Sequence, residues 1–160
     1  MNSWYRKALL MTGLAFTLVI CPGARAQEDS SGTQLLPGDI KWAGSPATPP
    51  GGQIAVLVGK PGQVGPYAFR LKFPADYKVM PHSHPEERIY TVLSGTWYIG
   101  LGDKFDPVKL KAFPVGSIYV IPARVRHFHW AKSGESIVQV NAVGPTATDY
   151  VDPADDPRKK

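Results

Sequence analysis

The sequence predicts an all-β fold, a sandwich or a barrel built from short strands. Short runs rich in β-branched and aromatic residues follow one another between residues 54 and 143, and each is bounded by Gly, Pro, Asp or Ser. Beyond the first 26 residues, no window carries an apolar 3.6-residue repeat long enough for a helix. The 16 Gly and 16 Pro of the 160 residues have no regular period, which indicates many turns. Several strands without helices are typical of a double-sheet or closed β structure.

We expect the strands in the following order along the chain. They are residues 54–58, 67–73, 89–93, 96–101, 109–113, 117–121, 127–131 and 137–143. Between them, Ser94-Gly95 and Ser133-Gly134 predict tight hairpin turns. Gly102-Asp103-Lys104 predicts a further turn.

The N-terminal 26 residues have the pattern of a secretory signal peptide. Arg6 and Lys7 precede an apolar run over residues 8–20, and Ala24-Arg25-Ala26 supplies the small residues of a cleavage site. The apolar run is shorter than the roughly 20 residues that span a bilayer. We therefore expect cleavage after Ala26, a periplasmic or secreted protein, and no stable membrane anchor. A lipid on Cys21 is a minor alternative, because the residue before it is not small.

The charge of the chain argues against a nucleic-acid partner. The whole sequence has 18 Lys+Arg and 13 Asp+Glu, a net charge of +5. Removal of residues 1–26 takes away three basic and no acidic residues, which leaves 15 basic and 13 acidic residues and a net charge of +2. The clusters among the remaining basic residues are only pairs, Lys109/Lys111, Arg124/Arg126 and Lys159/Lys160, and they form no basic patch. The single cysteine, Cys21, leaves with the signal peptide, so burial of a core and not disulfides must stabilise the exported domain.

The sequence predicts one domain, in keeping with its length. Residues 27–53 are polar and then rich in Pro and Gly, which predicts an irregular N-terminal arm. Residues 54–151 hold the predicted strands. Residues 152–160 are charged and contain Pro153 and Pro157, so we expect a solvated tail.

All four histidines of the chain fall in two spaced pairs, His82-Ser83-His84 and His127-Phe128-His129. In an extended chain, residues i and i+2 point to the same face, so each pair presents two imidazoles to one side of a sheet. Neutral imidazole is the commonest metal ligand in proteins. If the two strands face each other across a barrel, three or four ring nitrogens converge on one point, and the pattern predicts a metal site. The alternative is four ordinary histidines with satisfied hydrogen bonds.

Around these pairs the sequence resembles the two motifs of the cupin superfamily. The first motif is similar to HSHPEERIYTVLSG, from His82 to Gly95, and the second to GSIYVIPARVRHFHWA, from Gly116 to Ala131. The stretches TVLSGT and GLGDKFD resemble small single-domain bacterial cupins, RmlC-like proteins that mostly lack an assigned reaction. The resemblance covers about residues 38–152. It implies a double-stranded β-helix, the cupin jelly-roll barrel, with a metal held inside by His82, His84 and His127.

Three positions depart from the cupin motifs. Arg88 stands at the usual glutamate, Arg124 at the Gly of Pro-x-Gly, and Ala131 at the closing Asn. Arg88 matters most, because a guanidinium cannot ligate a cation. The candidates for a fourth ligand are Glu86, Glu87 and His129. The other options are a three-imidazole site with an open position, or a cupin that has lost its metal. Imidazole suits several divalent metals, so Fe, Mn, Zn, Ni and Cu all remain open.

A second hypothesis for Arg88 is that it binds a ligand inside the barrel. Strand alternation would place Arg88 and Tyr90 on the same face, so both are candidate ligand-binding residues. A cation inside the barrel would bind the carboxylate of a small anionic molecule. The alternative is that Arg88 pairs with a buried acid or turns outward to Glu86 or Glu87.

Two classes of function follow from these residues. The first is a metal-dependent enzyme acting on a small organic molecule, either a dioxygenase-like oxidoreductase or an isomerase or lyase. The second is a non-catalytic periplasmic module that binds or senses a ligand, with or without metal. Neither a cysteine nor a Gly-x-Ser-x-Gly elbow offers a competing nucleophile in the exported chain. Single-domain cupins often dimerise through sheet edges, which leaves a homodimer open.

Overall fold

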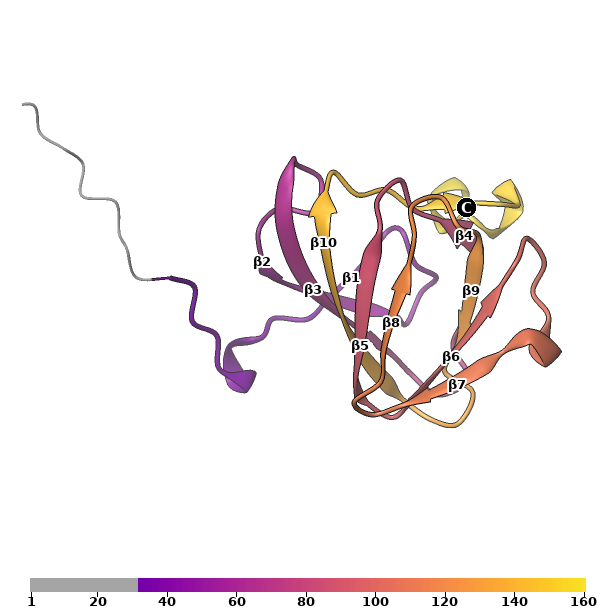
Figure 1. The fold of residues 1–160 in the computed structure, drawn as a ribbon, viewed down its shortest axis with the longest axis horizontal. Helices are drawn as coiled ribbons and strands as arrows, with labels where there is room; N and C mark the ends of the chain where they lie inside the picture. The colour runs from indigo at the N-terminus through magenta and orange to yellow at the C-terminus, as the bar shows by residue number, and fades with distance from the viewer. Residues whose placement is uncertain (1–31) are drawn as a thin grey trace, which may run out of the picture. The chain divides into compact units, whose positions relative to one another are not determined.

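The computed structural model describes residues 32–160, which form two antiparallel β-sheets (Figure 1). The strands are β1 (Ala43–Gly44), β2 (Gln53–Val58), β3 (Gly65–Phe73), β4 (Lys78–Ser83), β5 (Arg88–Ser94), β6 (Thr96–Leu101), β7 (Lys111–Pro114), β8 (Ile118–Ile121), β9 (His127–Trp130), β10 (Ser136–Gly144) and β11 (Asp149–Tyr150). The short 3-10 helices are η1 (Pro37–Asp39), η2 (Pro107–Lys109), η3 (Pro153–Asp155) and η4 (Pro157–Lys159). The all-β prediction is confirmed.

The strands are arranged in two sheets, and each sheet turns one face to the core. One sheet has the order β1-β2-β3-β10-β5-β8 and the other β11-β4-β9-β6-β7. The long strand β10 pairs with both β3 and β5, so it organises the larger sheet. Along β5, Arg88, Tyr90 and Val92 are buried while Ile89 and Leu93 are exposed, which is the two-residue alternation of a strand with one face on a core.

Every strand predicted from the sequence is present, with each bound within two residues of its predicted position. The list of predicted strands omits β4, although the histidine spacing treated residues 82–84 as extended, and it omits the two-residue strands β1 and β11. Pro81 explains the omission of β4, because proline cannot donate to a ladder and weakens a strand assignment. In the structure the pairing of β4 with β9 is irregular between Val79 and His82, and the strand absorbs Pro81 at that point.

The two predicted hairpins are wrong, although both turns exist. Ser94-Gly95 joins β5 to β6 and Ser133-Gly134 joins β9 to β10, and in each case the two strands belong to different sheets. The turns therefore carry the chain from one layer to the other. Gly95 is required here, because its φ is +70° and a Cβ would overlap the carbonyl oxygen of Glu135. Local turn signals do not report which sheet the next strand joins.

The motif position held by Arg124 has a conformation that favours glycine. Arg124 has φ +64°, in the left-handed region, and its backbone N–H donates to the carbonyl of His84 at 2.7 Å. The side chain of Arg124 is exposed. The backbone therefore keeps the turn that glycine usually provides, and the arginine side chain takes no part in the site.

Part of the N-terminal arm and part of the C-terminal tail pack onto the β domain, so the tail is less solvated than the sequence predicts. In the N-terminal arm, β1 pairs with β2, and the Tyr150 hydroxyl donates to the Ala47 carbonyl at 3.0 Å. The tail is not fully solvated, because Asp156 is 6% exposed and Arg158 donates to the Thr148 carbonyl at 2.7 Å. In Figure 1 the tail lies beside β4. Two Asp-Pro turns, η3 and η4, hold it there.

The predicted signal peptide lies outside the described residues. Among residues 32–160, no helix is long and apolar enough to cross a membrane.

Candidate metal centre

The four histidines form one buried cluster on the inner face of the smaller sheet. His82 lies on β4 and pairs directly with His127 on the neighbouring strand β9. His127 and His129 are two residues apart on β9, so both rings point inward, while Phe128 points to the opposite face against Phe105. The ring centroids of His82 and His127 are 4.4 Å apart, and those of His127 and His129 are 4.9 Å apart. The convergence of the rings that the two sequence pairs predicted is present, but the two strands are neighbours in one sheet and do not face each other across the barrel.

Three of these side chains are close enough to hold one ion. His82, His127 and His129 each offer a ring nitrogen, and these nitrogens lie within 4.8 Å of one another. With metal–nitrogen bonds of about 2.0 to 2.1 Å, two ligands of one ion lie at most about 4.2 Å apart, so only a small inward shift is needed. These three histidines could hold a metal ion.

His84 borders this triad without being one of its three members. Its ring centroid is 4.9 Å from that of His82 and 5.2 Å from that of His127. The sequence resemblance implied His84 as a ligand and left His129 as a candidate for the fourth position. The structure brings all four imidazoles together, and His129, not His84, completes with His82 and His127 the group whose ring nitrogens lie within 4.8 Å of one another.

Backbone carbonyls fix the orientation of three of the imidazoles. The Nδ1 atoms of His82, His84 and His127 lie 2.7, 2.8 and 2.9 Å from the carbonyl oxygens of Met80, Ala147 and Val125. A carbonyl only accepts, so each Nδ1 carries the hydrogen and each Nε2 keeps its lone pair. Metal-binding histidines in proteins are commonly held in this way.

The lone pairs at the centre of the cluster lack partners. Nε2 of His84, Nε2 of His127 and Nδ1 of His129 are buried and make no hydrogen bond to the described residues. A buried polar atom without a partner is costly, and a cation is the partner that several converging lone pairs share best. The donors present therefore fit a divalent metal ion that accepts imidazole ligands.

Burial keeps the imidazoles uncharged. Burial lowers the pKa of His127 to about 4. It also lowers the pKa values of His82 and His129 well below the ordinary value, and the neighbouring imidazoles add to this effect. The pKa of His84 is lowered by burial and then by the charge of Arg88. Neutral rings are the form that binds a metal.

Arg88 is buried beside the cluster and is paired with an acid. Its Nε donates to Oε1 of Glu86 at 2.7 Å, and the two side chains are only 6% and 8% exposed. The same oxygen accepts hydrogen bonds from the hydroxyls of Tyr67 at 2.7 Å and Thr146 at 2.5 Å. Burial raises the pKa of Glu86, but Arg88 and these donors outweigh burial and hold the pKa below its ordinary value. The charge of Arg88 is therefore largely compensated within the protein.

The two candidate carboxylate ligands have different surroundings. Oε1 of Glu86 is occupied by three donors, and its other oxygen, Oε2, is buried without a partner. Glu87 is exposed. Neither glutamate belongs to the group of His82, His127 and His129.

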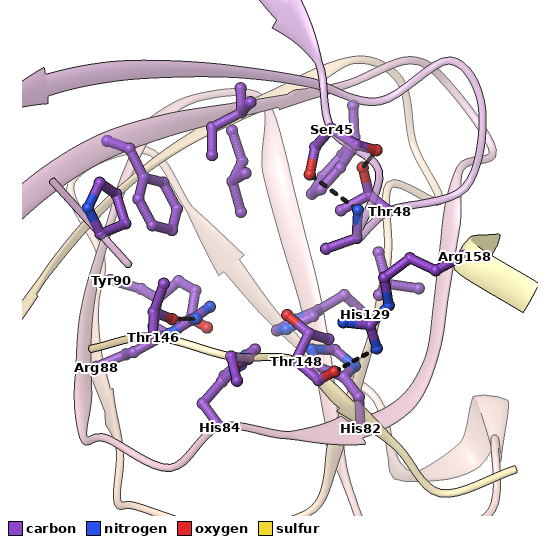
Figure 2. Close-up of a pocket in the computed structure, with 18 residues that line it drawn as sticks. Ser45, Thr48, His82, His84, Arg88, Tyr90, His129, Thr146, Thr148 and Arg158 are labelled. Carbon is purple, nitrogen blue, oxygen red and sulfur yellow. Dashed lines mark hydrogen bonds between the residues drawn. The ribbon is translucent and has the colours of Figure 1, made fainter. Parts of the chain in front are cut away.

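A cavity of about 250 Å³ opens next to the histidines (Figure 2). Four of the site residues predicted from the sequence line the cavity: His82, His84, Arg88 and Tyr90. His129 also lines it. The walls include the apolar side chains of Ile54, Phe69, Leu71, Phe73 and Val79. The cavity therefore places the histidines and Arg88 against space for a small, partly apolar molecule.

Three consecutive residues after β10 tie the site together, and the sequence reasoning did not single them out. Thr146 bonds to both Glu86 and Arg88, the Ala147 carbonyl accepts from His84, and the Thr148 carbonyl accepts from Arg158. All three residues line the cavity, as does Arg158. We call residues 146–148 the strap. No local pattern marks the strap, because its role depends on where the chain passes after β10.

Comparisons with known proteins support the fold. The polyketide cyclase RemF from Streptomyces resistomycificus superposes with a TM-score of 0.63 at 18% identity, covering 79% of this chain and 89% of that one. KdgF from Halomonas sp. gives 0.57 at 19% identity, with 71% and 96% covered. An RmlC-like cupin from Shewanella frigidimarina gives 0.54 at 14% identity, with 71% and 93% covered.

These likenesses identify the class of protein by its architecture: the chain has the cupin fold, as its two motifs suggested. No family model matches the sequence. No curated protein matches it either. At such low identities the likeness extends to the fold alone, so the reaction must be argued from the site.

Proposed function

We propose that this protein binds one divalent metal ion in its histidine cluster and acts as an enzyme on a small anionic organic molecule held in the adjacent cavity. The observation that carries the proposal is the convergence of His82, His127 and His129, whose ring nitrogens lie within 4.8 Å of one another. Bound there, the metal would supply a Lewis acid that polarises a substrate oxygen.

The protein's own residues would prepare the site for this chemistry. The carbonyls of Met80 and Val125 orient the rings of His82 and His127 so that Nε2 faces the cluster. The neutral imidazoles leave the metal's positive charge uncompensated, which favours an anionic ligand. Tyr90 and Arg88 line the same cavity and offer polar groups close to the histidines. The apolar wall would exclude water from the rest of a bound molecule.

Metal analysis of protein purified without a polyhistidine tag tests the proposal. We expect close to one equivalent of Fe, Mn, Zn, Ni or Cu per chain. Because the chain's four histidines all lie in this cluster, no other histidine can account for the metal. His127→Gln should lower metal affinity by more than about a hundredfold, since it removes a direct ligand. The matched control is Glu87→Gln, an exposed residue whose loss should leave affinity unchanged. Metal-free wild type, or equal affinity in both variants, would refute the metal site.

A metal-dependent enzyme and a non-catalytic binding module differ in whether the metal carries an exchangeable water molecule. An enzyme needs an open coordination position, which water relaxation measurements detect on the Mn- or Cu-loaded protein. Exchangeable water together with turnover of a small acid that depends on the metal supports the enzyme. A tightly held metal without exchangeable water supports a binding module.

Export is part of the proposal. It is supported by Arg6-Lys7, the apolar run over residues 8–20 and Ala24-Arg25-Ala26. The intact mass of the protein from its native compartment should correspond to a chain that begins at Gln27. A mass that includes residues 1–26, or a lipid on Cys21, would overturn it.

A further inference from the structure

A second arginine, Arg158, lies at the cavity on the packed C-terminal tail. Its Nε donates to Oδ1 of Asp156 at 2.7 Å, and its Nη2 donates to Oδ2 at 2.8 Å and to the Thr148 carbonyl at 2.7 Å. A guanidinium has five N–H groups, and these bonds use three of them. The two N–H groups on Nη1 donate no hydrogen bond to any of residues 32–160. The tail therefore holds a guanidinium in a fixed position with one nitrogen free.

Arg88 is held in the same manner. Its Nε donates to Glu86 at 2.7 Å and its Nη2 donates to the Thr146 hydroxyl. Nη1 donates to neither Glu86 nor the strap, and the Tyr90 hydroxyl is the other polar group beside the guanidinium. Both arginines line the cavity. Figure 2 shows Arg88 and Arg158 on opposite sides of the labelled histidines. The side chain of Arg88 is 6% exposed and that of Arg158 is 41% exposed, so Arg158 marks the end nearer to solvent.

With a divalent metal bound, the site would have a net charge of +2. Arg88 is compensated by Glu86 and Arg158 by Asp156. Histidine ligates a metal as the neutral ring. The two charges of a divalent ion would therefore be uncompensated, and a buried charge is stable only when it is paired. A ligand with two negative charges would neutralise the loaded site.

We propose, building on the metal site proposed above, that the ligand is a small dicarboxylate whose two carboxylates reach Nη1 of Arg88 and Nη1 of Arg158. Its apolar middle lies against Leu71 and Phe73 of β3 and Val79 of β4, which also line the cavity. Guanidinium and carboxylate match in shape and charge, so each end gains an ionic hydrogen bond. Arg158 is then the residue that distinguishes a diacid from a monoacid.

Matched pairs of simple acids test this directly. The probes are adipate against hexanoate and glutarate against pentanoate, each titrated by calorimetry into zinc-loaded and metal-free protein. We expect the zinc-loaded wild type to bind one of the two diacids at least about tenfold more tightly than the monoacid of equal length, as one extra ionic hydrogen bond provides. The preference should be smaller in the metal-free protein.

Substitutions assign the preference to Arg158. Arg158→Gln should weaken diacid binding about tenfold and leave monoacid binding unchanged. Arg158→Lys keeps the positive charge but loses the planar, forked arrangement of donors. It should therefore retain more of the preference for the diacid than Arg158→Gln does, but less than the wild type. The matched control is Arg126→Gln, because Arg126 is exposed, pairs with Asp103 at 3.6 Å and does not line the cavity. Circular dichroism checks that each variant remains folded.

The outcomes separate this inference from the metal proposal. Equal binding of diacid and monoacid by the wild type, no binding of either, or a preference that survives in Arg158→Gln would overturn the dicarboxylate assignment. These results leave the metal site standing if zinc still binds in one equivalent. Failure to take up any metal overturns the proposed function itself, whatever the acids do.

Discussion

Removing the carboxylate of Glu86 should strongly destabilise the protein, because it leaves Arg88 buried without its counter-charge. In Glu86→Gln the amide keeps the size of the side chain and loses the negative charge. Arg88 is 5% exposed, and three donors converge on Oε1 of Glu86. Breaking a buried ion pair by neutralising one partner costs about 3 to 5 kcal/mol. Because the amide oxygen can still accept, we expect the lower end, about 3 kcal/mol.

Urea unfolding of the metal-free protein measures this effect. The midpoint should fall while the m-value stays unchanged, since the surface exposed on unfolding is the same. The double variant Glu86→Gln/Arg88→Met removes the stranded charge and should recover most of the loss, because replacing both partners of a buried pair is often neutral. Glu87→Gln, at the neighbouring exposed position, should change the free energy of unfolding by less than about 0.5 kcal/mol. A loss below about 1 kcal/mol in Glu86→Gln, or no recovery in the double variant, would refute a buried ion pair here.

Two further predictions concern the backbone and the buried histidines. Arg124→Gly should stabilise the protein by roughly 0.5 to 1 kcal/mol in urea unfolding, because φ +64° is unfavourable for arginine and the exposed side chain contributes nothing to the site; a loss of stability would contradict the left-handed turn. The metal-free protein should be most stable above about pH 6.5, where histidines of the unfolded chain are neutral, and should lose stability as the pH falls from there toward 4. Burial lowers the pKa of folded His127 to about 4, so over this range the unfolded chain binds the extra proton, and His127 alone contributes about 1.4 kcal/mol per unit of pH. Unfolding curves that do not change between pH 7 and pH 5 would show that the imidazoles are accessible to protons.

The fold could be predicted from local patterns because each strand carries its own signal. Alternating buried and exposed residues on β5, and glycines at positions that need a positive φ, identify strands and turns without reference to the rest of the chain. The sheet to which a strand belongs has no such local signal. The turn at Gly95 therefore looked like a hairpin although β5 and β6 lie in different sheets. Similarly, Pro81 hid the strand that carries His82.

The site could be predicted only in part, for a related reason. Residue spacing identified the two histidine pairs, because the two-residue period of a strand makes their rings point to one side. The family resemblance implied His84 as the third ligand and left His129 as a possible fourth, whereas His129 completes the group of three in the structure; spacing alone does not rank the two, since that depends on how β4 and β9 register against each other. The positions of the strap and of Arg158 depend on the path of the chain after β10, which no short motif encodes. Sequence reasoning therefore found the histidines that could hold a metal ion and missed several of the groups that surround the cavity.

The pairing of Arg88 with Glu86 changes the meaning of the main departure from the cupin motifs. An arginine at the usual glutamate position would by itself repel a cation beside it. Here a carboxylate two residues earlier accompanies it, and Tyr67 and Thr146 hold that carboxylate on the guanidinium. The pair adds almost no net charge to the cavity, so the histidine cluster keeps the electrostatic surroundings of an all-imidazole site. Arginine at this position is therefore compatible with a bound metal. A metal held here would have imidazole ligands without the usual carboxylate, and a bound molecule would have to balance its positive charge.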